Sequence, residues 1–219
     1  GEGTQNFRRL PAMTRSQAEA SLQLGREMAR LAASSADIAG LGEMGIANTT
    51  TAAALLCVFA DVDPEQAAGP GAGAAPPMVG RKAQVIREAI RLHQPCRTDP
   101  LGVLAAVGGF EMGAVAGFLL EASALRLPVV LDGFPGSAGA LVAQAMDPDC
   151  LRQVFFGHAS AEPGHRAMLQ ALGGSPILQL DMRLGEGTGA ALAIGVIEAA
   201  VRLYRDMATF DEALMDGGL

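Results

Sequence analysis

The chain has 219 residues, 50% of them hydrophobic, which is enough to build the core of one sizeable α/β domain. Its formal net charge of -7 argues against a nucleic acid as the main partner, because binding to a phosphate backbone needs a basic surface. The three cysteines, Cys57, Cys96 and Cys150, have neither metal-site spacing nor the pattern of a disulfide framework, and they indicate a reducing cytoplasm. The most apolar helix, near Gly189–Val201, is too short to cross a bilayer and contains Glu198, so we expect no membrane partner.

A helix is predicted near the start of the chain, in the stretch PAMTRSQAEA. Thr14 is a typical helix cap, and Gln17 follows it at the spacing of a capping box. We expect this helix to continue to about Ser34.

After this helix, one kind of unit occurs four times: a short apolar run, a loop of Gly, Ser, Thr and acidic residues, and an Ala-rich helix. A Gly/Pro/Ala-rich loop (Ala67–Gly80) and two helices (about Lys82–Leu92 and Leu101–Leu125) separate the first unit from the second. The alternation predicts an α/β fold, with a mostly parallel sheet and helices on both faces in a Rossmann-like arrangement of three layers. We expect residues 1–219 to form a single domain. The units are ADIAGLGEMGIANTTTAAALLCVF, LPVVLDGFPGSAGALVAQAM, VFFGHASAEPGHRAMLQAL and ILQLDMRLGEGTGAALAIGVIEAAVRLY.

The loops after the four predicted strands carry the sequences GLGEMG, LDGF, GHASAEPGH and RLGEGTG. Ligands of open parallel sheets bind beyond the carboxyl ends of the strands. We therefore expect the loops to meet at one edge of the sheet, with Glu43, Asp132, Ser160 and Glu186 close together.

The first loop has the features of an anion-binding turn. Glycines such as Gly45 allow a ligand to approach the backbone, and Asn48 and Thr49 then open a helix whose free N–H groups point back into the loop. The alternative is an ordinary strand-to-helix turn with an Asn or Thr cap. The loop matches neither the dinucleotide fingerprint nor the P-loop.

Two acidic residues at strand ends have open roles. Glu186 stands between two glycines, so its carboxylate is either presented to a ligand or simply solvated. Asp132 can bind a metal, hold a ribose hydroxyl or cap the next turn, and we include it among the expected substrate-binding residues. The acidic pair and Thr-rich turn of enzymes that use phosphoribosyl diphosphate are missing, which argues against a Mg²⁺-dependent enzyme of that kind.

The third loop contains His158, Ser160, Glu162 and His165. A serine next to histidines suggests a hydrolase, but the G-x-S-x-G turn of a nucleophilic serine is absent. A contact from the Ser160 hydroxyl to a phosphate is favoured, with Glu162 or Pro163 at the start of the next helix.

All but one of the 16 basic residues are arginines, and the exception is Lys82. A lone lysine can mark a position that needs a compact ammonium group. It can also have been kept by chance at a solvated helix end, and composition leaves both interpretations open.

Together, these loops resemble those of the nicotinate-nucleotide–dimethylbenzimidazole phosphoribosyltransferases. The stretches that carry the resemblance are GEMGIANTT, VGGFEMGAVAGFLLEASALRLPVVLDGF, SAEPGH and RLGEGTGAALA. The stretches PAMTRSQA, RKAQVIREAI and ATFDEA also match, so the resemblance extends over essentially the whole chain in the same order.

The resemblance implies a transferase of cobalamin lower-ligand assembly. Nicotinate mononucleotide and 5,6-dimethylbenzimidazole would give α-ribazole 5′-phosphate and nicotinate, with inversion at the anomeric carbon of the ribose. The donor is already an activated pyridinium glycoside, so we expect neither a metal nor a cofactor. Members of the family are typically dimers, and we expect a homodimer.

The resemblance also implies roles for individual residues. Glu186 is similar to the family's catalytic base, and Glu43 to its second acidic residue, facing the ribose or the developing positive charge. Lys82 is similar to a lysine on the phosphate side. The positions that resemble the nucleotide pocket are Gly45, Asn48, Thr49, Gly133 and Ser160, with Leu184 and Gly185 in its wall.

Family members extend well before the position equivalent to Gly1, and that part supplies much of the benzimidazole pocket and of a small helical domain. We therefore expect a complete nucleotide side and incomplete recognition of the base. Two alternatives stay open: a relative that attaches another lower-ligand base, such as a purine or a phenol, and a protein that binds the nucleotide without turnover. Retention of both Glu43 and Glu186 favours an enzyme, whereas the missing N-terminal part favours a binding protein.

Overall fold

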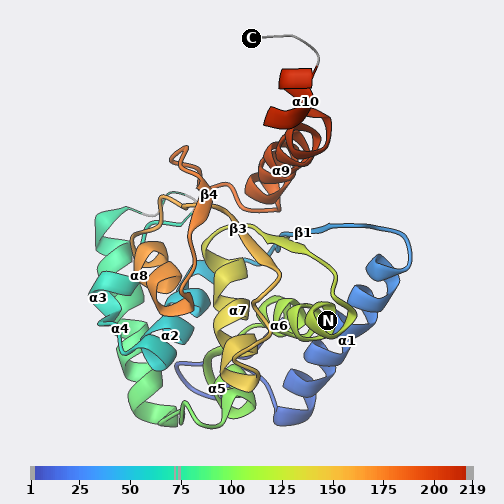
Figure 1. The fold of residues 1–219 in the computed structure, drawn as a ribbon. Coiled ribbons are helices and arrows are strands. Elements are labelled where there is room, and N and C mark those ends of the chain that lie inside the picture. Colours follow the sequence, from blue (N-terminus) through green and yellow to red (C-terminus); the bar gives the residue numbers. More distant parts are fainter. Residues whose placement is uncertain (1–2, 72, 74, 216–219) are drawn as a thin grey trace.

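A computed structural model describes residues 3–71, 73 and 75–215 of the chain (Figure 1). Its strands are β1 (Ala39–Leu41), β2 (Val129–Leu131), β3 (Val154–His158) and β4 (Pro176–Leu178). Its helices are α1 (Arg15–Ala33), α2 (Asn48–Ala60), α3 (Pro64–Ala67), α4 (Pro76–His93), α5 (Pro100–Val107), α6 (Phe110–Leu125), α7 (Phe134–Met146), α8 (Pro163–Leu172), α9 (Thr188–Asp206) and α10 (Phe210–Met215).

The strands form one parallel sheet in the order β1-β2-β3-β4, so each strand lies beside the next one in the chain. Leu41 pairs with Leu131, Leu131 with Phe156, and Phe156 with Pro176. Each of the four predicted units supplies one strand and the helix after it. The predicted α/β fold with a parallel sheet is therefore confirmed.

The strand β2 shows why the fold has three layers. Val129 and Leu131 belong to the main core beneath the sheet, whereas Val130 packs with Ala190 and Ala193 of α9 on the other face. A strand buried on both faces needs a continuous apolar run, and β2 is such a run. Figure 1 shows α9 on one side of the sheet and α7 and its neighbouring helices on the other.

The main core supports the starts of the helices that follow the strands. Leu55 and Leu56 of α2, Phe134 of α7 and Met168 of α8 are fully buried there, together with Leu131. Because this packing holds α2, α7 and α8 against one another, their N-termini have defined positions at the carboxyl edge of the sheet.

The first helix agrees closely with its prediction. The Thr14 side chain accepts the N–H of Gln17, the Gln17 side chain accepts the N–H of Thr14, and the helix ends at Ala33 with Ser34 as its cap. Its close packing on α6 depends on glycines, because a Cβ atom at Gly25 would collide with backbone atoms of α6.

Two boundaries between the first and second units were predicted wrongly. The expected helix Leu101–Leu125 is two helices, α5 and α6, because Gly108 and Gly109 adopt extended backbone conformations between them. The expected loop Ala67–Gly80 is shorter, since α4 begins at Pro76. Residues 72 and 74 of that loop lie outside the described residues.

No helix in the described part of the chain has the length and apolar character that a membrane span requires.

Candidate active site

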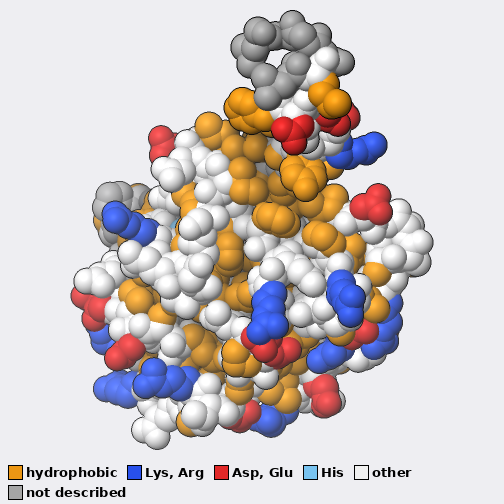
Figure 2. Space-filling model, viewed as in Figure 1, with side chains coloured by type: hydrophobic (Ala, Val, Ile, Leu, Met, Phe, Trp, Pro, Cys, Tyr) orange, Lys and Arg blue, Asp and Glu red, His pale blue; other side chains and the backbone are white. Residues whose placement is uncertain are grey.

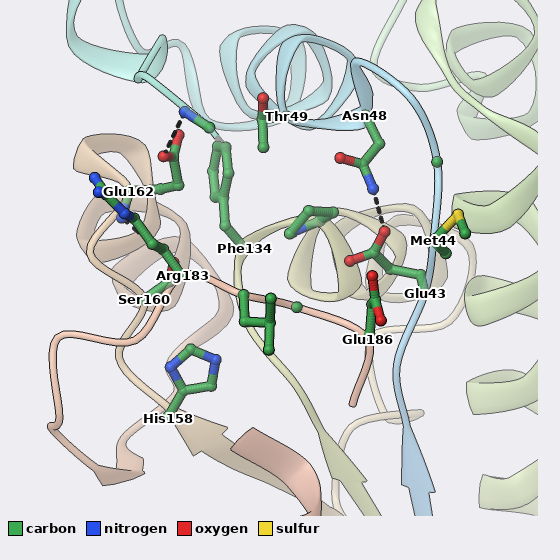
Figure 3. Close-up of a pocket in the computed structure, with 16 residues that line it drawn as sticks. Glu43, Met44, Asn48, Thr49, Phe134, His158, Ser160, Glu162, Arg183 and Glu186 are labelled. Atoms are coloured by element: carbon green, nitrogen blue, oxygen red, sulfur yellow. Dashed lines mark hydrogen bonds between the residues drawn. The ribbon is translucent and has the colours of Figure 1, made fainter. Parts of the chain in front are cut away.

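A pocket lies where the four loops meet, at the carboxyl edge of the sheet (Figure 3). All of the expected site residues except Asp132 and Lys82 line this pocket. The expected residues that line it are Glu43, Gly45, Asn48, Thr49, Gly133, Ser160, Leu184, Gly185 and Glu186.

The pocket is surrounded by helix starts. The helices α2, α7 and α8 begin at its wall, and the N-cap residues of these three starts, Ala47, Gly133 and Glu162, make no side-chain cap bond to their helices. Free N–H groups and the helix dipole together give each start a partial positive charge. The wall therefore offers an anionic group, such as a phosphate, several donors at once.

The two acidic residues of the site face each other (Figure 3). Glu43 is half-buried and accepts a hydrogen bond from the Asn48 side-chain amide, whereas Glu186 is exposed at the pocket mouth. Burial raises the pKa of Glu43 to about 7, and the negative charges of Glu111, Asp132 and Glu186 add to this effect. A carboxyl group with such a pKa exchanges protons at neutral pH.

Glu186 has an unusual backbone conformation. Gly185, Glu186 and Gly187 have φ angles of 80°, 58° and 81°, so three consecutive residues lie in the left-handed region. Only the glycines adopt this region without cost, and the side chain of Glu186 makes it unfavourable by about 1 kcal/mol. The turn also rests on the first loop, because a Cβ atom at Gly42 would collide with the backbone nitrogen of Gly187. The loops that carry Glu43 and Glu186 are thus in direct backbone contact.

Asp132 does not line the pocket, contrary to the expected contact with substrate. It is 1% exposed and lies beneath the pocket, where its carboxylate accepts the N–H groups of Gly187, Gly189 and Ala190 at 3.0, 2.8 and 3.2 Å. Burial by itself opposes ionisation, but the contacts with His158 and with these N–H groups outweigh it and lower the pKa of Asp132. The carboxylate therefore caps α9 from a neighbouring strand.

Lys82 also lies outside the pocket, at its border. Its Nζ donates to Thr49 Oγ1 at 3.2 Å and to the carbonyl oxygen of Gly69 at 2.9 Å. Burial lowers the pKa of Lys82, and the nearby charge of Glu162 opposes this. The ammonium group thus stands directly behind Thr49, which does line the pocket.

Glu162 and Arg183 are charged residues of the pocket that the sequence did not assign to a role there. Glu162 is buried and accepts the N–H of Gly71 at 2.8 Å, which ties the loop before α4 to the start of α8. Arg183 is exposed and precedes the LGEG motif directly, and that position is the signal that marks it as a pocket cation. The unpredicted lining residues are Met44, Gly71, Phe134, Pro135, His158, Glu162 and Arg183.

The third loop does not have the geometry of a nucleophilic serine. His165 Nδ1 accepts the backbone N–H of Ser160 at 2.7 Å, and Nε2 lies 3.1 Å from Ser137 Oγ. Burial, followed by the neighbouring His158, lowers the pKa of His165 to about 3, so the ring is neutral. His165 therefore organises the loop and does not activate the Ser160 hydroxyl. Within the described ranges, no three His, Cys, Asp or Glu side chains are arranged to hold a metal ion.

Comparison with known proteins gives the same relatives by sequence and by structure. The nicotinate-nucleotide–dimethylbenzimidazole phosphoribosyltransferase of Syntrophotalea carbinolica is 48% identical over 216 residues, which are 99% of this chain and 61% of that protein. The protein of the same name from Geobacter sulfurreducens is 47% identical over 212 residues, which are 96% and 60% of the two chains. The crystal structure of CobT from Thermus thermophilus matches with a TM-score of 0.90 and 48% identity, over 96% of this chain and 63% of that one.

This chain thus spans about three fifths of the length of the curated relatives that it matches. The sequence model of a phosphoribosyltransferase family matches residues 1–215. Because this match takes in nearly the whole chain, including the four loops of the pocket, the chain belongs to that phosphoribosyltransferase family.

Proposed function

We propose that this chain transfers the phosphoribosyl group of nicotinate mononucleotide to 5,6-dimethylbenzimidazole, giving α-ribazole 5′-phosphate and nicotinate. The observation that carries the proposal is the facing pair of carboxylates, Glu43 and Glu186, in a pocket surrounded by helix starts. Relatives that are 45–48% identical bear the name of this activity.

In this proposal, the phosphate of the nucleotide lies at the side of the pocket formed by Thr49 and Ser160. The starts of α2 and α8 offer N–H groups there, with the hydroxyls of Thr49 and Ser160 beside them. Arg183 supplies a cation from the mouth of the pocket, and Lys82 stands behind Thr49. We propose Gly45, Asn48, Gly133, Leu184 and Gly185 as the rest of the nucleotide-binding wall.

The proposed chemistry needs one base and no metal. A ring nitrogen of dimethylbenzimidazole attacks the anomeric carbon of the ribose. At the same time, the bond between this carbon and the nicotinate nitrogen breaks. The electron pair of the broken bond stays on nicotinate, which neutralises the pyridinium ring. The other azole nitrogen gives its proton to the Glu186 carboxylate, so the new glycoside leaves as a neutral ring.

Glu43 has a different role in the proposal. As the old bond lengthens, positive charge passes from the pyridinium ring to the ribose, and a carboxylate beside the anomeric carbon stabilises this charge. The half-buried position of Glu43 strengthens that interaction, because a partly desolvated site screens charges less than water does.

The proposal is tested by incubating the protein with nicotinate mononucleotide and dimethylbenzimidazole, and by separating the products chromatographically. We expect nicotinate and α-ribazole phosphate to appear in equal amounts. A parallel series with a purine and with a phenol identifies the accepted base. Calorimetric binding of the nucleotide without any product would instead assign the chain to the binding proteins. The Syntrophotalea carbinolica relative serves as the reference for the assay.

We also propose that residues 1–219 form a single domain, that the protein is a homodimer, and that it works in the reducing cytoplasm. One continuous core from Ala12 to Leu172 supports the single domain. Figure 2 shows hydrophobic side chains gathered around α9. Val201 and Tyr204 of this helix are exposed, and a partner subunit would cover them. The free cysteines suit a reducing compartment. A monomer in light scattering at micromolar concentration would contradict the dimer.

A further inference from the structure

The position of Glu186 depends on something outside its own turn. The turn Gly185–Glu186–Gly187 has a left-handed backbone at all three residues, and the Glu186 side chain makes this conformation unfavourable. Locally, the carbonyl oxygen of Gly185 accepts the Thr188 hydroxyl at 2.8 Å and the Thr188 N–H at 3.1 Å, and neither bond involves Glu186 or Gly187. Such a conformation persists only where surrounding groups hold it.

Asp132 is the group that holds it. Its Oδ2 accepts the N–H of Gly187, and its Oδ1 accepts the N–H groups of Gly189 and Ala190. The N-cap of α9 is Gly187, which has no side chain to do this work. One carboxylate from the end of β2 therefore satisfies three donors at the start of α9 and fixes the residue next to Glu186.

His158 holds Asp132 in turn. Its ring is 1% exposed and lies between Gly133 and Gly189, where a Cβ atom at either glycine would meet the ring. Its Nε2 lies 3.4 Å from Asp132 Oδ1, on the side of the carboxylate that bonds Gly189. The ring thus packs against the Asp132 carboxylate on the side of α9, and it also lines the pocket (Figure 3).

We propose that Asp132, supported by His158, is a positioning residue for Glu186 and does not itself contact the substrate. This inference rests on the proposed function, since Asp132 would position Glu186, the proposed general base of that reaction. It replaces the expected contact between Asp132 and the substrate. The reason is geometric: the carboxylate is buried and already accepts three N–H groups, and a substrate hydroxyl would have to displace one of them.

The test compares Asp132→Asn, Glu186→Gln and the double variant. Asparagine keeps the shape but replaces one acceptor oxygen with an amide that repels the N–H groups of α9. We expect kcat to fall about 10²-fold in Asp132→Asn, with the dissociation constant of nicotinate mononucleotide within about twofold of wild type. The double variant should be no slower than Glu186→Gln alone, because both changes remove the same positioned base.

Asp99→Asn is the matched control. Asp99 also caps a helix, accepting the N–H of Gly102 at the start of α5, but it lies away from the pocket. It should lower the melting temperature and leave kcat unchanged. A similar loss of kcat in this control would show that Asp132 affects only general stability, and would overturn the proposal.

Hydrogen exchange of the segment 183–190 provides a readout that needs no turnover. Asp132→Asn should accelerate exchange at the amides of Gly187, Gly189 and Ala190, and leave exchange in β1 unchanged. Unchanged exchange there, or a rise of tenfold or more in the nucleotide dissociation constant, would overturn the positioning role whether or not the wild type turns over. An inactive wild type that shows the expected exchange would count against the proposed function alone.

Discussion

Replacing Glu43 with glutamine is expected to stabilise the protein, and by an amount that grows with pH. Burial raises the pKa of Glu43 from 4.5 to about 7. The folded protein therefore holds a proton between these values that the unfolded chain has already lost, and the free energy of unfolding falls as pH rises from about 4.5 to 7. Glutamine carries no proton to lose, and it still accepts the hydrogen bond from Asn48.

The size of the effect follows from the same two values. The difference between the folded and unfolded pKa values of Glu43 lowers the free energy of unfolding by at most about 3 kcal/mol, at about 1.4 kcal/mol for each pKa unit. Because Glu43 is only half-buried and water screens part of the repulsion, we expect about 1–2 kcal/mol at pH 8. For a chain of this length, that corresponds to a rise of roughly 2–8 °C in the melting temperature.

Urea unfolding of wild type and Glu43→Gln at pH 5, 6, 7 and 8 measures this difference. The variant should approach wild type at pH 5 and exceed it increasingly up to pH 8. Glu198→Gln, on the exposed side of α9, is the control and should track wild type throughout. A difference that is equal at pH 5 and pH 8 would refute the electrostatic argument, because it would not depend on the proton of Glu43.

Substitutions at three further positions test other parts of the site. Glu186→Gln should lower turnover about 10²–10⁴-fold with little change in nucleotide affinity, measured by kinetics and calorimetry, and near wild-type turnover would mean that Glu186 only precedes a helix. Lys82→Ala should weaken nucleotide binding by about 1.5–3 kcal/mol, and Lys82→Arg should restore it only in part, whereas equal affinity in wild type and alanine variant would exclude a phosphate contact. Gly42→Ala should lower kcat and the melting temperature together, because the methyl group pushes the Glu186 turn away from the first loop, and an unchanged kcat would separate that contact from catalysis.

The fold could be predicted well because its signals are local. An apolar run, a Gly-rich loop and an Ala-rich helix follow one another within each unit, and parallel pairing places the loops at one edge. The helix break at Gly108 and Gly109 was missed although two adjacent glycines are a local signal for a turn, because the Ala and Leu residues on both sides of them favour a helix.

The contacts within the site were harder to predict from the sequence, because the most important of them join residues far apart in the chain. Asp132 was correctly placed at the end of a strand, but its three partners lie in the turn before α9, and nothing local to LDGF indicates them. The raised pKa of Glu43 depends on burial and on Glu111 in α6, and Glu111 lies far from the first loop in the sequence. The roles assigned to Glu43 and Glu186 stay predictions until variants are measured.

The most direct test of the central claim follows the anomeric carbon of the ribose. Nicotinate mononucleotide labelled with ¹³C at that carbon is mixed with dimethylbenzimidazole and the protein, and the reaction is observed by NMR. The account predicts that the signal of the β-linked pyridinium glycoside is replaced by that of one α-linked benzimidazole glycoside, as free nicotinate appears in equal amount. Free ribose 5-phosphate as the labelled product would indicate hydrolysis, and an unchanged substrate signal under conditions in which the Syntrophotalea carbinolica relative is active would contradict the transferase assignment.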